Sequence, residues 1–66
     1  MQHILAKTIL ISRVSELIAK EYSMSIHDAR DAFYNSKVID ILDDDDSGLY
    51  GESPLYIFSL FERYKK

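Results

Sequence analysis

Apolar residues recur at helical spacing in the first third of the chain. Between residues 10 and 22 they stand three or four positions apart, at Leu10, Ile11, Val14, Leu17, Ile18 and Tyr22. Polar residues, including Ser12, Arg13, Ser15, Glu16 and Lys20, fall between them. This pattern predicts an amphipathic helix with one apolar and one polar side. Residues 3–11 are apolar on too many sides for a single stripe, so we expect something else, such as a second copy of the chain, to cover the start of this helix.

A second helix is predicted to begin after the break at residues 22–25. Ser25 is followed three residues later by Asp28, which is a variant of the capping box and places a carboxylate near the positive end of the helix. The helix is expected to stop near Asn35 and Ser36. Its predicted buried residues are Ile26, Ala29, Ala32 and Phe33.

A short third helix is predicted next, with Ser36 as its capping residue. Val38, Ile39, Ile41 and Leu42 would be its apolar positions, and Asp40 would point outward. The helix should end near Asp43, because the aspartates that follow oppose the helix dipole and repel one another. The β-branched content of residues 38–42 leaves a short strand as the alternative.

The last helix is predicted to start at Ser53 and Pro54, a capping hydroxyl followed by proline at the first helical position. Gly48 and Gly51 precede it and are expected to supply turn conformations that other residues avoid. Ile57, Phe61 and Tyr64 would share one face of this helix.

These elements predict an all-α fold, a bundle of three to four helices formed by one domain over residues 1–66. A domain of this size buries roughly 60% of the surface of its unfolded chain, which makes the core marginal. No cysteine is present to add a disulfide. The 47% of hydrophobic residues and the eight aromatic ones exceed what one small core can hide, which indicates self-association.

Membrane insertion and nucleic-acid binding are not favoured by the sequence. No apolar run approaches the roughly 18 residues of a membrane helix, and no export signal is visible, so a cytoplasmic location is expected. The net charge is −3, but residues 40–52 carry −6. A helix-turn-helix around residues 23–25 makes DNA binding an alternative, although Arg30 and Lys37 are the only basic residues of the second and third predicted helices.

The acidic loop is the most specific candidate for a functional site, a site for a metal ion. Residues 43–48 fit the opening of an EF-hand calcium loop, with oxygen ligands at positions 1, 3 and 5 and glycine at position 6. The candidate ligands are Asp43, Asp45, Ser47 and Glu52. Position 12, which should be a bidentate glutamate, is Pro54, and Glu52 stands two places early. A cation-binding loop over residues 43–52 is therefore an alternative to a solvated acidic loop.

Catalysis is not predicted. No glycine-rich phosphate loop, nucleophile elbow or cysteine is present. His3 and His27 lie in different segments without a second ligand at zinc-site spacing. His27 stands four residues before Asp31, so a surface pair between them is expected. No cofactor is expected.

We therefore predict a protein–protein interaction module, most simply a homodimer, built on the first and last helices. Tyrosine is enriched at protein interfaces, and several tyrosines lie near the end of the chain. The candidate interface residues are Ile4, Leu5, Ile11, Tyr50, Tyr56, Phe58 and Tyr64.

The order of these features resembles small bacterial helical proteins of unknown function. The resemblance covers roughly residues 12–64 and rests on three segments: residues 24–29 (MSIHDA), residues 48–50 (GLY) and residues 52–57 (ESPLYI). Some proteins of this kind are similar to the small partners of toxin–antitoxin pairs. The resemblance therefore implies that the product of a neighbouring gene is a partner, and it carries no functional residue over.

Overall fold

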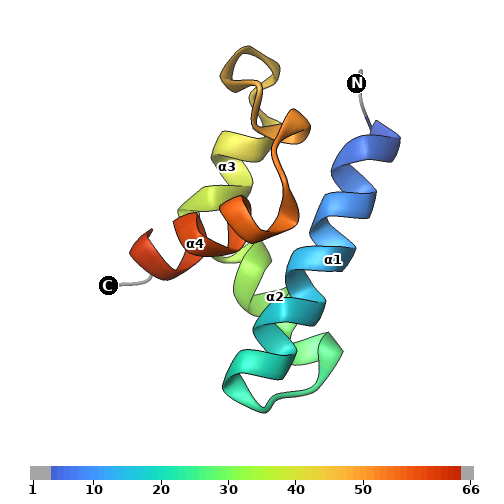
Figure 1. Cartoon of the computed structure of the whole chain (residues 1–66), viewed down its shortest axis with the longest axis vertical. Coiled ribbons are helices and arrows are strands. Elements are labelled where there is room, and N and C mark those ends of the chain that lie inside the picture. Colours follow the sequence, from blue (N-terminus) through green and yellow to red (C-terminus); the bar gives the residue numbers. More distant parts are fainter. Residues whose placement is uncertain (1–3, 65–66) are drawn as a thin grey trace.

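The computed structural model describes residues 4–64, except for the side chain of Asp45. The described chain forms four α-helices joined by short connections (Figure 1). In chain order they are α1 (Ile4–Tyr22), α2 (Ile26–Tyr34), α3 (Lys37–Asp43) and α4 (Pro54–Tyr64), with the short 3₁₀ turns η1 (Asp45–Ser47) and η2 (Leu49–Gly51) between α3 and α4. The predicted all-α bundle is confirmed, and the alternative of a strand over residues 38–42 is wrong.

α1 is the longest helix and ends in a Schellman motif. Ser23 takes a left-handed conformation with φ of 53°. The Met24 amide donates to the Ala19 carbonyl at 3.0 Å, which satisfies a carbonyl that the last helical turn leaves free. Met24 and Ala19 both pack against the core, and apolar residues at these two positions frequently accompany the motif. The chain is thereby reversed so that α2 packs back along α1.

The polar side of α1 is not all exposed. Leu10, Val14 and Ile18 are buried as predicted, but Ser15 is fully buried too. Ser15 lies four residues after Ile11 and three before Ile18, on the flank of α1 adjacent to its apolar stripe. The assignment of Ser15 to the polar side was wrong, because the helix packing covers this flank as well as the central stripe.

α2 begins as predicted but buries fewer residues than predicted. The Ser25 hydroxyl accepts a hydrogen bond from the Asp28 amide at 3.1 Å, which is the N-cap interaction. Ala29 and Phe33 are fully buried, and Ala32 is half-buried. Ile26 is 44% exposed, so its prediction as a core residue was wrong. It is the first residue of the helix, where α2 lies at the edge of the bundle.

α3 is a two-turn helix whose predicted cap does not form. Ser36 occupies the N-cap position, but its hydroxyl donates to the Phe33 carbonyl at 2.6 Å and makes no cap hydrogen bond. That hydroxyl therefore closes the end of α2. Val38 and Leu42 are buried, Asp40 is exposed, and the helix ends at Asp43 as predicted.

The two glycines of the following loop differ in conformation. Gly48 has φ of 70°, the left-handed region expected for a turn glycine. Gly51 does not have a positive φ, so the prediction that it needs glycine's freedom was wrong. Between them, Leu49 is buried and anchors the loop to the core.

α4 starts with the predicted cap, because the Ser53 hydroxyl accepts from the Tyr56 amide at 3.2 Å. Ile57 and Phe61 are buried, whereas Tyr64 is about half exposed. The Phe61 ring lies 6.1 Å from the Phe33 ring, centroid to centroid, at an interplanar angle of 57°. This tilted aromatic pair joins α4 to α2 in the centre of the molecule.

The core lies where α1, α2 and α4 meet and extends to α3 and η2, which contribute the buried residues Val38, Leu42 and Leu49. α1 packs against α2 along its second half and against α4, which crosses it, while α3 packs on α4 (Figure 1). The molecule measures 32 × 23 × 18 Å. The start of α1 extends beyond α2 (Figure 1), which is the shorter helix, with nine residues against 19. Over residues 4–64, no helix combines the length and apolar character needed to cross a bilayer.

Candidate functional site

The acidic loop is held by its own hydrogen bonds. The Ser47 hydroxyl lies 2.7 Å from the Ile41 carbonyl and 2.8 Å from the Asp44 carbonyl, and it accepts from the Leu49 amide at 3.2 Å. An Asp44 carboxylate oxygen accepts from the Asp46 amide at 3.0 Å. These local contacts are typical of serine and aspartate in turns. They account for the loop's compact shape without an ion.

Three of the candidate calcium ligands, Asp43, Ser47 and Glu52, lie within the described part of the structure. Asp43 and Glu52 are both exposed, and Ser47 uses its hydroxyl within the loop. The side chain of Asp45 lies outside the described part of the structure. Among the residues that the structure describes, no three histidine, aspartate or glutamate side chains are grouped so that they could hold a metal ion. The geometry of the described residues therefore adds no support to a calcium site.

A lysine from α1 links this loop to the rest of the fold. The Lys7 ammonium group donates to the Asp43 backbone carbonyl at 3.1 Å. Asp43 is the last residue of α3, so a positive charge lies at the negative end of that helix dipole, which is the favourable arrangement.

The histidine expectations have separate outcomes. His27 Nε2 lies 3.7 Å from an Asp31 carboxylate oxygen, and both side chains are largely exposed. The predicted surface pair is confirmed. His3 lies outside the described residues.

The predicted interface residues fall into two groups. Ile4, Leu5, Tyr56 and Tyr64 expose about half of their side chains or more. Ile11, Tyr50 and Phe58 are half-buried and pack against the core. Sequence reasoning also missed exposed apolar residues, of which Leu55 and Ile9 are 67% and 49% exposed. The signal for Leu55 was present, because it lies on the opposite side of its helix from Ile57 and Phe61.

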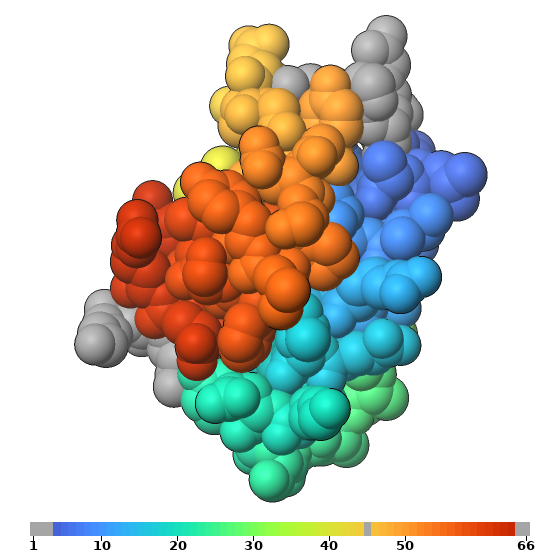
Figure 2. All heavy atoms as spheres, in the orientation of Figure 1, coloured from blue at the N-terminus to red at the C-terminus, as the bar shows by residue number. Residues whose placement is uncertain are grey.

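One groove lies between α1 and the start of α4, with a volume of about 510 Å³. Leu17 and Leu55 supply its apolar surface together with Pro54. Arg13 and Lys20 also line it from α1. We call it the Leu55 groove. Figure 2 views the molecule from this side, with the start of α4 in orange beside α1 in blue.

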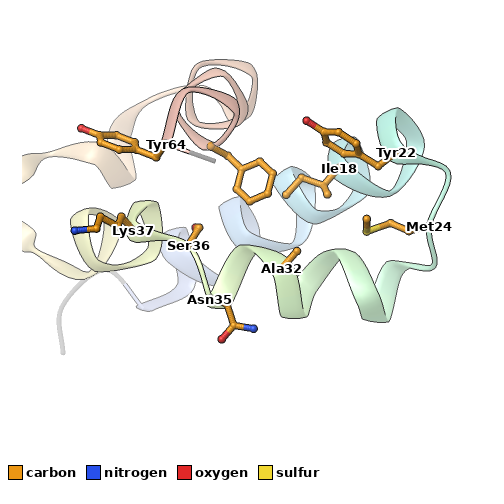
Figure 3. A pocket seen from close by; sticks show the side chains of 9 residues that line it. Ile18, Tyr22, Met24, Ala32, Asn35, Ser36, Lys37 and Tyr64 are labelled. Atoms are coloured by element: carbon orange, nitrogen blue, oxygen red, sulfur yellow. The ribbon is translucent and has the colours of Figure 1, made fainter. Parts of the chain in front are cut away.

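A second groove of about 510 Å³ lies where α1, α2 and α4 approach one another. It is lined by residues from these three helices, from the α1–α2 and α2–α3 connections and from the start of α3, among them Ile18, Tyr22, Met24, Lys37, Phe61 and Tyr64 (Figure 3). We call it the Tyr64 groove. The Tyr22 hydroxyl donates a hydrogen bond to a Glu62 carboxylate oxygen at 2.5 Å, which connects the α1 wall of the groove to α4.

The part of the chain that the structure describes thus offers grooves and exposed apolar residues rather than a cluster of reactive groups. Comparison with protein-family models, with curated proteins and with solved structures found no match. The resemblance to small bacterial helical proteins therefore stays a prediction.

Proposed function

We propose that the chain is a helical interaction module that works as a homodimer through the outer side of α1 and the start of α4. The observation that carries the proposal is the exposure of Leu5 and Leu55, at 73% and 67%. Large apolar side chains exposed near one another are a feature of protein–protein interaction sites. A domain this small also gains stability from association, because its own core is limited.

Helical spacing connects these residues into one surface. Leu5, Ile9 and Arg13 follow one another at intervals of four and so lie along one side of α1. Arg13 in turn lines the Leu55 groove. We call Leu5, Ile9 and the Leu55 groove together the dimer surface. The exposed apolar residues Leu5 and Ile9 are therefore connected along α1, through Arg13, to the Leu55 groove, whose rim also carries Glu16 and Lys20.

A ridge and a groove on the same surface are complementary to a second copy of that surface. If two α1 helices pack antiparallel about a twofold axis, Leu5 and Ile9 of one copy enter the Leu55 groove of the other, and the reverse contact forms at the same time. A standard interface buries about 800 Å² per partner. The monomer exposes 4566 Å², so such an interface would use about a sixth of its surface.

Sedimentation equilibrium over a concentration series tests the proposal. We expect the wild-type protein to have twice the chain mass of 7.7 kDa, and we expect Leu5→Lys and Leu55→Lys to be monomers. Both side chains are exposed in the monomer, so neither change should unfold it. Tyr34→Lys is the matched control, because Tyr34 is 50% exposed on α2 and lies outside the dimer surface. A wild-type mass of 7.7 kDa at every concentration would refute the proposal.

A further inference from the structure

The Tyr64 groove has the dimensions of a small-molecule site. Its volume of about 510 Å³ falls within the roughly 300–1,000 Å³ of ligand pockets. It shares no lining residue with the dimer surface, which is built from other positions of α1 and from the start of α4. An inference about this groove is therefore independent of the proposed homodimer.

The floor of the groove is apolar and fixed in place. Ile18 is fully buried and lies beneath the groove, whereas Phe61 is 6% exposed and presents one edge to it. Phe61 is held by its contact with Phe33, and Tyr22 by its hydrogen bond to Glu62. The pocket thus exists before any ligand binds, which reduces the entropy lost on binding.

The two ends of the groove differ in chemistry. Lys37 and Tyr64 lie at one end and Tyr22 and Met24 at the other, with Ala32 between them (Figure 3). Asn35 and Ser36, which precede Lys37 in the chain, also line the groove, and the remaining lining is apolar apart from the Tyr22 hydroxyl. A ligand that spans the groove would therefore meet donor groups at the first end and mostly apolar surface along the rest. This arrangement selects for a molecule with a polar head and an apolar tail.

The charge at the polar end selects the sign of the head group. Among the described residues that line the groove, Lys37 is the one that carries a charge. Within residues 4–64, no hydrogen bond or ion pair occupies the Lys37 ammonium group or the Tyr64 hydroxyl. Glu62, which reaches the Tyr22 hydroxyl, does not line the groove. Both free groups can donate hydrogen bonds, and donors of this kind complement an anion.

We propose that the Tyr64 groove binds a single-chain hydrophobic monocarboxylate, with its carboxylate between Lys37 and Tyr64 and its chain running over Ile18 and Phe61 towards Met24. Apolar burial along the chain supplies most of the affinity. The exposed ammonium–carboxylate contact contributes less, because solvent screens it, and its main effect is to orient the ligand and to select anions.

The test uses decanoate below the concentration at which it forms micelles. The full chain is titrated while the methyl resonance of Met24 is followed by NMR, and decan-1-ol and decyltrimethylammonium serve as uncharged and cationic counterparts. We expect a saturable shift with decanoate and weaker binding of the cation. Lys37→Gln should weaken decanoate roughly two- to fivefold, as expected for an exposed ion pair, and should leave decan-1-ol unchanged.

Lys20→Gln is the matched control, because Lys20 is an exposed lysine outside this groove, and it should change neither ligand. The proposal is overturned if decanoate produces no saturable shift, if both lysine variants weaken it equally, or if the cation binds as tightly as the anion. It is overturned as well if the Met24 resonance responds to anionic phospholipid vesicles but not to free decanoate, since the site would then recognise a membrane surface.

Discussion

Ser15 gives the most direct test of the packing. Its side chain is fully buried between elements of the core, and its hydroxyl is the one buried side-chain polar atom of the described residues that has no hydrogen-bond partner. Burying a hydroxyl without a partner costs about 1–3 kcal/mol relative to leaving it in water. Ser15→Ala removes that oxygen and keeps the Cβ, so the helix packing is preserved.

The expected change in the free energy of unfolding of Ser15→Ala is the sum of opposing effects. Removal of the unpaired oxygen contributes about 1–3 kcal/mol, and alanine is the better helix former by roughly half a kcal/mol. The small void left by the oxygen takes away contacts worth about 1 kcal/mol or less. We therefore expect the free energy of unfolding to rise by about 1–2 kcal/mol, which corresponds to a Tm increase on the order of 4–16 °C for a domain of this size.

Thermal unfolding followed by circular dichroism measures this shift. The two proteins must be compared at equal concentration, because dimerisation makes Tm depend on concentration. Ser12→Ala is the control, since Ser12 lies in the same helix but is only half-buried, and it should show the helix-propensity gain alone. A Tm for Ser15→Ala that is equal to or below that of the wild type would show that the hydroxyl has a partner, and the reasoning would fail.

Four further outcomes follow from the structure. Gly48→Ala should lower the free energy of unfolding by about 1–2 kcal/mol because of its left-handed φ alone, since a Cβ there meets no atom within 4 Å. Gly51→Ala has equal space but no positive φ, so it should be neutral or slightly stabilising. Equal losses of stability for the two variants in urea unfolding would contradict this prediction. Ser25→Ala should remove the cap of α2 and cost about 0.5–2 kcal/mol, which the same urea experiment detects. Phe33→Ala should lower the free energy of unfolding by about 3–5 kcal/mol, whereas Ile26→Ala should lower it by less than about 1 kcal/mol because Ile26 is 44% exposed. A loss at Ile26 as large as that at Phe33 would show that Ile26 is a core residue. Calorimetric titration with calcium at millimolar concentration should release no heat, and the ion should leave Tm unchanged. A saturable heat of binding would support a calcium site in the acidic loop.

The sequence determined the features that depend on neighbouring residues. The caps at Ser25 and Ser53 form as expected, because an N-cap hydroxyl and the amide that it accepts from are only three residues apart. α3 ends at Asp43 for an equally local reason, the unfavourable position of further aspartates at the negative end of a helix dipole. Helical spacing likewise identified the central core residues Val14, Ile18, Phe33 and Phe61.

Only the tertiary structure decided which flank of each helix is covered. Spacing places Ser15 beside the apolar stripe of α1 and Ile26 on that of α2, yet Ser15 is buried and Ile26 is exposed. The Ser36 hydroxyl could either accept from an amide of α3 as its N-cap or donate to a carbonyl at the end of α2. Because α3 follows α2 so closely, the hydroxyl donates to the Phe33 carbonyl. Both grooves are lined by residues from distant parts of the chain, from Arg13 to Leu55 in one and from Ile18 to Tyr64 in the other. Helical periodicity describes one helix at a time, whereas a groove depends on the positions of several helices relative to one another.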